Sequence, residues 1–166
     1  MRARSGTIPR AAPLRLIAVT FLAISLPPCS GPLDSGGEGL PRGTIDISRN
    51  GNVLATYRVE LAVTPEDQAK GLMNRQSMPR DEGMAFLFST PVRGSFYMKD
   101  TLIPLDIAFW DQGGRIISIM TMTPCQADPC PTYTPDGDYV GALEVNAGVF
   151  EEKGVRVGDQ VVLKEG

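Results

Sequence analysis

The stretch Gly94–Asp111, GSFYMKDTLIPLDIAFWD, decides the fold of this chain. It contains the only Trp and two of the six Phe. Its second half, Leu105–Trp110, alternates as a strand does: Leu105, Ile107 and Phe109 share one face, and Asp106, Ala108 and Trp110 share the other. A shorter strand is predicted over Ser95–Lys99. The two strands predict that this stretch lies in the middle of a β-sheet.

Working outward, the same signals predict six further strands: Thr44–Ser48, Val53–Val63, Met84–Phe88, Arg115–Met122, Tyr139–Val145 and Gln160–Lys164. Asn50-Gly51 predicts a tight hairpin turn, because a type I′ turn needs positive φ at both central residues. Regular alternation of strands and helices is absent from the pattern. We therefore expect a mainly β domain with a minor α component: a compact, mostly antiparallel barrel-like or folded-sandwich domain of about eight strands.

Two short helices are predicted. The first begins at Thr64-Pro65, since Thr caps a helix and Pro suits its first position, and it should run to about Met73. Its inward side chains are expected to be Ala69, Leu72 and Met73. The second helix is predicted over Ala147–Lys153 and ends at Gly154.

The most informative polar residue is Asp106, an acid in the middle of an apolar strand. A buried carboxylate must be paired or hydrogen-bonded, or it takes up a proton. We expect Lys99 or Arg75 to be its partner, and Asp100 joins the candidate set as the neighbour of Lys99. Two interpretations stay open: a polar pocket that binds an anionic or hydroxylated ligand, or a structural ion pair between the Arg75 loop and the sheet.

Catalysis is an alternative, with Lys99 and Asp106 as acid-base groups of an enzyme. The chain has no His, which removes the commonest general base and the Ser-His and Cys-His nucleophile pairs. It also has no Gly-x-Ser-x-Gly motif and no carboxylate pair at a readable spacing. Catalysis is thus left open, but the sequence favours a protein that is not an enzyme.

A metal-handling protein is a third hypothesis. Met73, Met84 and Met98 carry thioethers of the kind that select Cu(I), but Met more often fills gaps in a core. Asp128, Asp136 and Asp138 crowd one loop as Ca²⁺ ligands can, although Asp-Gly-Asp is also ordinary turn chemistry. The sequence indicates no resident metal and no cofactor.

Cys125 and Cys130 enclose four residues in a Pro-rich loop. Outside the cytoplasm such a pair favours a disulfide, which would hold the shape of the loop. A redox-active pair is the alternative, but the spacing is not Cys-x-x-Cys and no helix start follows it.

The N-terminus predicts export. Residues 1–28 combine four Arg with the apolar run Leu16–Leu26, which is typical of an export signal. Cys29, followed by Ser-Gly, resembles the acylation site of bacterial lipoproteins, although two prolines precede it where that motif has small residues. Residues 29–43 read as a flexible linker, and 44–166 as one globular domain. We expect a protein that is exported, either membrane-anchored through Cys29 or periplasmic or secreted.

Charge excludes some partners. Without residues 1–28 the chain has 12 basic and 19 acidic residues, a net charge of −7. Nucleic acid needs a basic footprint, so we expect no nucleic-acid partner. An electrostatic contact with anionic lipid is likewise disfavoured, which leaves the N-terminal signal or lipid anchor as the membrane attachment.

Three motifs carry a family resemblance: Gly71-Leu72-Met73-x-Arg75, Gly83-Met84-x-Phe86-Leu87-Phe88, and the stretch quoted above. In this order they resemble the family known as domain of unknown function 192, from about Asn52 to Leu163. The resemblance implies a fold family but no activity, since the function of that family is unknown. It also places Arg75, Lys99 and Asp106 each at a polar position of the motifs.

Together these observations favour a non-catalytic extracytoplasmic module that binds a small ligand or a component of the cell envelope. The expected groove lies where the Arg75 loop meets the turn from Lys99 to Asp106. The alternatives are the envelope enzyme and the Cu or Ca handler described above.

Overall fold

A computed structural model of the chain describes residues 39–165. The predicted export signal, Cys29 and most of the expected linker lie outside the described residues. Within the described part, the first strand begins at Arg42, so the end of the linker predicted at residue 43 already belongs to the sheet.

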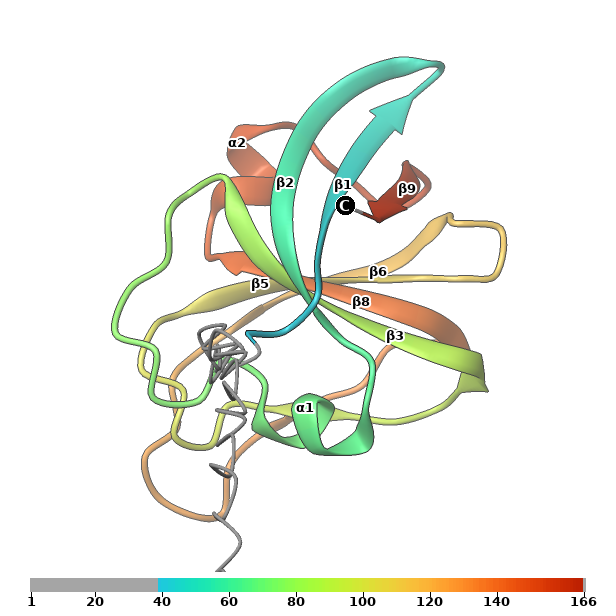
Figure 1. Ribbon diagram of the computed structural model, residues 1–166. Helices are drawn as coiled ribbons and strands as arrows, with labels where there is room; N and C mark the ends of the chain where they lie inside the picture. Colours follow the sequence, from blue (N-terminus) through green and yellow to red (C-terminus); the bar gives the residue numbers. More distant parts are fainter. Residues whose placement is uncertain (1–38, 166) are drawn as a thin grey trace, which may run out of the picture. The chain divides into compact units, whose positions relative to one another are not determined.

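Nine strands and two short helices follow one another (Figure 1): β1 Arg42–Arg49, β2 Asn52–Ala62, α1 Pro65–Lys70, β3 Glu82–Val92, β4 Phe96–Tyr97, β5 Leu105–Trp110, β6 Ile116–Met122, β7 Thr132–Tyr133, β8 Tyr139–Asn146, α2 Val149–Glu152 and β9 Gln160–Glu165. Seven of the strands form one sheet in the order β6-β5-β8-β3-β2-β1-β9, and β4 pairs with β7 in a separate two-stranded sheet. The mainly β class with two short helices is confirmed.

The large sheet curls without closing. Its two edge strands meet at one end only, where Arg115 bridges Gln160 and the Ile116 amide donates to Asp159 O at 2.9 Å. Beyond that end β6 and β9 are not paired. The domain is therefore barrel-like in its curvature but an open sheet in its hydrogen bonding.

One strand pair departs from the expected arrangement. β2 and β3 are parallel, whereas every other pair in the sheet is antiparallel. The connection between them carries α1, as a parallel pair requires a crossover. The sequence pattern had predicted no β-α-β unit, and one is present.

Local signals were mostly reliable. Asn50 and Gly51 have φ of 50° and 79°, as the predicted hairpin turn between β1 and β2 requires. Thr64 caps α1 by accepting a hydrogen bond from the Asp67 amide at 3.1 Å. The predicted end at Met73 is wrong, because Gly71 at φ 48° and ψ −135° terminates α1 after Lys70. Leu72 is buried as expected, but Ala69 is exposed and Met73 only half-buried.

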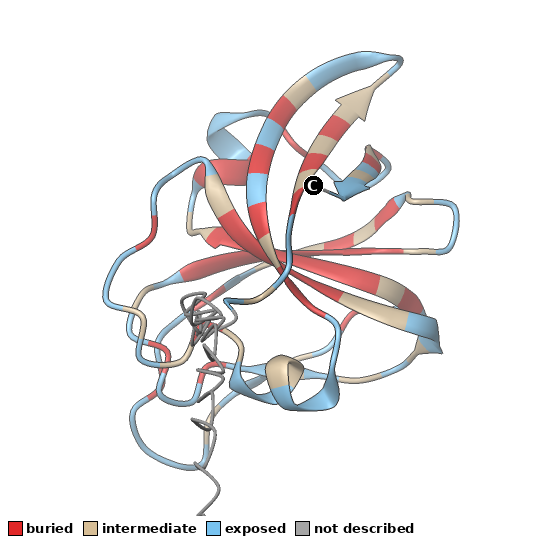
Figure 2. Ribbon diagram, viewed as in Figure 1, coloured by how far each residue is buried: buried red, intermediate tan, exposed pale blue. Residues whose placement is uncertain are grey.

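The sheet has a core on each face. β5 is buried along its whole length, while β2 shows alternate burial (Figure 2). Tyr57, Val59 and Trp110 belong to the cluster that α2 covers, and Ile107 and Phe109 belong to the cluster on the opposite face. In Figure 1, α1 and α2 accordingly lie on opposite sides of β3, β8 and β5.

No helix in residues 39–165 combines the length and apolarity needed to cross a membrane.

Candidate functional site

The face of the sheet that α1 partly covers contains a cavity of about 330 Å³, which we call the aromatic cavity. Its lining comes from α1 and the turn after it, from β3, from β4 and from β8. The aromatic members are Phe86, Phe88, Phe96, Tyr97 and Tyr139, and the α1 side contributes Gln68, Lys70, Leu72 and Met73. Ligand pockets span about 300–1,000 Å³ and are mostly apolar, so this cavity suits a small molecule.

The aromatic rings brace one another. Phe96 packs edge-to-face on Phe86 with ring centroids 5.0 Å apart, and on Phe109 at 5.4 Å. Tyr139 contacts Phe109 at 4.9 Å and Phe88 at 5.4 Å. Edge-to-face pairs of this kind stabilise beyond the area they bury, so the wall of the cavity is preformed.

One carboxyl group lines this aromatic cavity. Glu144 lies on the central strand β8 and is only 5% exposed. In the sheet register it stands opposite Met84 on β3 and Ile107 on β5, both apolar. Burial raises the pKa of Glu144 to about 8, and no hydrogen-bond donor or cation in the described part of the chain offsets that effect. The carboxyl is thus held protonated near neutral pH.

A second buried polar group accompanies it. Thr101 is 5% exposed and also lines the cavity. Its hydroxyl donates to Lys99 O at 3.5 Å, the upper limit for such a bond, so the lone pairs of its oxygen remain available as acceptors.

Asp106 is buried, as predicted, but the expected partners are wrong. It lies on the opposite face of the sheet from the cavity, where its Oδ1 accepts from Thr121 Oγ1 at 2.7 Å. Its Oδ2 accepts from the amides of Gly148 at 2.8 Å and Phe150 at 3.4 Å, at the start of α2. Oδ1 therefore links β5 to β6, and Oδ2 holds the start of α2 against β5.

Arg75 and Lys99 each pair with another acid. Arg75 Nη2 lies 2.7 Å from Glu60 Oε2 on β2. Lys99 Nζ lies 2.6 Å from Asp128 Oδ2, and that hydrogen bond raises the pKa of Lys99. Neither cation forms an ion pair with Asp106 among the described residues, so the three candidates are not brought into one cluster.

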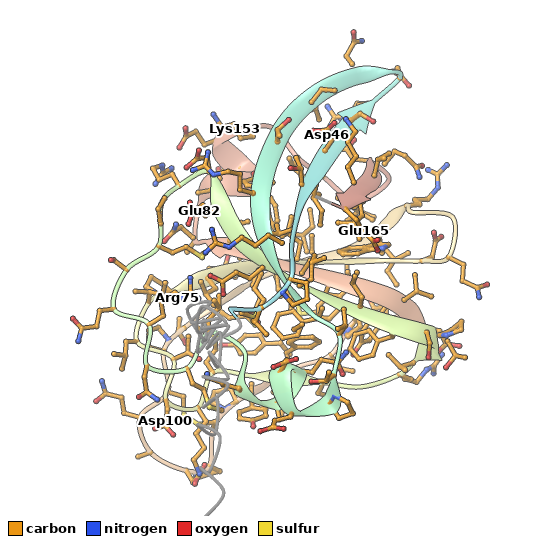
Figure 3. All side chains as sticks on the ribbon, in the orientation of Figure 1. Asp46, Arg75, Glu82, Asp100, Lys153 and Glu165 are labelled. Atoms are coloured by element: carbon orange, nitrogen blue, oxygen red, sulfur yellow. A yellow bond between two sulfur atoms is a disulfide. The ribbon has the colours of Figure 1, made fainter. Side chains whose placement is uncertain are left out.

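Asp100 acts through its backbone. It has φ 55°, donates its amide to Cys125 O at 3.0 Å and accepts from the Asn74 amide at 2.8 Å. The Arg75 loop and the Lys99–Asp106 turn therefore do meet, as expected, but through main-chain bonds. Figure 3 shows Arg75 beside the sheet and Asp100 in the loops below it.

The Cys pair closes the loop beside this turn. The Sγ atoms of Cys125 and Cys130 lie 2.05 Å apart, the bonding distance of the predicted disulfide. Cys125 also forms an isolated β-bridge with Lys99, and the Cys125 amide donates to Met98 O at 3.2 Å. The loop thus supports the segment that carries Phe96 and Thr101 into the cavity wall.

Two of the three acids of the Pro-rich loop form ion pairs. Asp128 binds Lys99, and Asp138 accepts from Arg93 Nε at 2.8 Å. Across residues 39–165, no group of three Cys, Asp or Glu side chains is gathered as metal ligands would be.

Sequence reasoning missed Glu144. Its setting in Leu143-Glu144-Val145 gives the same signal that singled out Asp106, an acid between apolar residues of a predicted strand. The local sequence around Glu144 does not reveal the cavity, because α1 and β4, which form its other side, come from elsewhere in the chain.

The chain is similar in sequence to one known protein family. A sequence profile of the family DUF192, described as "Uncharacterized ACR, COG1430", matches residues 45–163. A search of curated proteins finds no match.

Two solved structures are similar over most of the chain. A protein of unknown function from Novosphingobium aromaticivorans has 32% sequence identity and a TM-score of 0.70, with 76% of this chain and 89% of that chain covered. A Sinorhizobium meliloti protein, titled a "putative transcription regulator", has 29% identity and a TM-score of 0.71, with 77% of this chain and 98% of that chain covered. On the profile match and the shared fold, this chain belongs to the DUF192 family.

Proposed function

We propose that this protein is a non-catalytic, extracytoplasmic binding module whose small ligand occupies the aromatic cavity. The observation that carries the proposal is Glu144, a buried carboxyl in an aromatic cavity with no partner from the described chain. Burying an uncompensated polar group costs free energy, and a protein retains such a group where a ligand compensates it. We therefore propose the aromatic cavity as the binding site, in place of the groove predicted at Arg75.

Rigidity supports binding. The cavity walls are interlocked rings and two segments tied by main-chain hydrogen bonds, so little ordering is needed when a ligand enters. Preorganisation of this kind lowers the entropy cost of association.

The enzyme alternative draws less support from the geometry. A Lys acts as an acid-base catalyst when its pKa is lowered, whereas the pKa of Lys99 is raised by Asp128. Asp106 has both carboxylate oxygens hydrogen-bonded on the other face of the sheet. The metal alternative meets a similar difficulty, since Asp128 and Asp138 hold Lys99 and Arg93.

The partner and location follow from the sequence. We propose export through the N-terminal signal, with Cys29 as the lipid attachment point or the signal as anchor. A ligand from the cell envelope suits that location. The Sinorhizobium meliloti relative is described as a "putative transcription regulator", but we do not propose that role for this chain, because its net charge of −7 without residues 1–28 disfavours nucleic acid.

A thermal-shift screen of a fragment library tests the proposal. The screen uses the exported, oxidised full chain, its Glu144→Gln variant and, as a matched control, Glu151→Gln on the exposed side of α2. Fragments should raise the Tm of wild type and Glu151→Gln and fail to raise that of Glu144→Gln. Fragments that stabilise all three proteins equally, or a library without a hit, would contradict the proposal.

A further inference from the structure

The acidic and basic residues that line the aromatic cavity differ in burial. Its acid, Glu144, is 5% exposed, whereas the two basic residues of its lining, Lys70 on α1 and Arg93 after β3, are exposed. Arg93 uses Nε to bind Asp138, which leaves its terminal nitrogens for other acceptors. The cavity therefore has an acidic residue at its floor and two basic residues at its mouth.

Within residues 39–165 no ion pair joins Glu144 to Lys70 or Arg93, and Arg93 pairs with Asp138 instead. Nearby cations would lower the pKa of a buried carboxyl, yet burial alone accounts for the shift of Glu144. The remaining titratable groups of the lining are the hydroxyls of Tyr97 and Tyr139, and burial raises the pKa of Tyr139.

Resting on the proposed function, we propose that the ligand is a small zwitterion with an apolar or aromatic body. Its ammonium group binds Glu144 and Thr101 at the floor of the cavity. Its carboxylate lies at the mouth with Lys70 and Arg93. An amino acid with a hydrophobic side chain has this chemistry.

The floor of the cavity suits an ammonium group. An ammonium supplies three donors, and the Glu144 carboxylate and the Thr101 hydroxyl are acceptors in the same buried region. A charge-assisted hydrogen bond gains strength where water is excluded, and aromatic faces attract an organic cation. Since Glu144 is protonated beforehand, its proton passes to the solvent when the ammonium binds.

The mouth selects against simpler ligands. A plain amine would bind Glu144 but would make no contact with Lys70 and Arg93 at the mouth. A plain carboxylic acid would bind Lys70 and Arg93 and leave Glu144 without a partner. The zwitterion alone matches both ends, so discrimination should be visible in binding to molecules that differ by one charged group.

Calorimetry with three probes of the same phenyl body tests the inference: phenylalanine, phenethylamine and 3-phenylpropionic acid. The exported full chain should bind phenylalanine at least about tenfold more tightly than either other probe, which is the effect of one added charged contact. Glu144→Gln should weaken phenylalanine binding by a similar factor. Lys70→Gln combined with Arg93→Gln should abolish the preference for phenylalanine over phenethylamine, whereas the control Lys153→Gln, remote on the α2 side, should preserve it.

The outcomes separate this inference from the proposed function. Equal affinity for the three probes, or a preference for the amine or the acid, overturns the zwitterion. The zwitterion is also overturned, with the binding site intact, if library fragments bind in a Glu144-dependent manner and phenylalanine does not. If neither phenylalanine nor any fragment binds, the proposed function fails as well. Lys70 and Arg93 are exposed, so their variants should fold and keep the test decisive.

Discussion

Glu144 on β8 stands directly opposite Ile107 on β5, and the two side chains share the face of the sheet that forms the aromatic cavity. A carboxyl beside an aliphatic side chain in the middle of a sheet is poorly solvated, and no partner in the described part of the chain stabilises its charge. Burial therefore favours the protonated form of this group near neutral pH. This relationship leads to a prediction about stability as well as to the proposed ligand.

Stability should fall as pH rises from about 5 to about 8. The pKa of Glu144 is about 8 in the folded state, against 4.5 as its ordinary value, so the folded state binds the extra proton in that range. The free energy of unfolding should therefore decrease by about 1 kcal/mol per pH unit over this window. Urea titrations at several pH values measure the effect.

The matched variant for that measurement is Glu144→Gln. It cannot ionise, so its free energy of unfolding should be nearly flat from pH 5 to pH 8 and should exceed that of wild type at pH 8. The same slope in both proteins would mean that another group titrates and that Glu144 is not buried as described.

Asp106→Ala should destabilise the protein by about 2–3 kcal/mol, because it leaves the Thr121 hydroxyl and the amides at the start of α2 without their acceptor. Asp106→Asn keeps one oxygen and should cost less. Ligand affinity of the folded fraction should stay within about twofold of wild type, because Asp106 lies on the other face from the cavity. The control is Asp136→Ala, at an exposed position. A selective loss of affinity in Asp106→Asn would contradict this account and show that Asp106 belongs to the binding site.

Reduction of Cys125–Cys130 should weaken ligand binding. The loop that it closes holds Lys99 through Asp128, and β7, which follows this loop, pairs with β4 at Phe96. Opening so short a loop should also cost about 2 kcal/mol of stability on the chain-entropy account. Affinity with and without dithiothreitol measures the effect, and a Cys125→Ser, Cys130→Ser double variant should be weak under both conditions and indifferent to the reductant.

Gly71→Ala should lower both stability and affinity. Gly71 adopts φ 48° and ψ −135°, which a residue with a Cβ avoids, at a cost of about 1–3 kcal/mol. An added Cβ would also lie 3.4 Å from Cζ of Phe86, in the wall of the cavity. Gly137→Ala, where φ is not positive, is the control, and equal melting temperatures of the two variants would contradict this account.

The sequence predicted what local chemistry determines. The two faces of Leu105–Trp110, the Asn50-Gly51 turn and the Thr64 cap each depend on residues close together in the chain, and each is confirmed. The parallel pairing of β2 with β3 was missed, because it depends on packing between segments that local patterns do not relate.

The site was harder to predict for the same reason. The burial of Asp106 followed from its neighbours, but its partners are a threonine of β6 and amides of α2, which the sheet register brings together. Charge complementarity had suggested Lys99 and Arg75 instead. Glu144 gave the same local signal as Asp106, and only the folded chain distinguishes the carboxyl with partners from the one without.

The most direct test of the central claim, that the aromatic cavity built around Glu144 is a ligand site, is native mass spectrometry of the exported protein purified from the cell envelope in its oxidised form. Wild type and Glu151→Gln should carry one additional small-molecule mass, and Glu144→Gln should lack it. A bare protein in all three cases, or a bound mass that persists in Glu144→Gln, would contradict the claim.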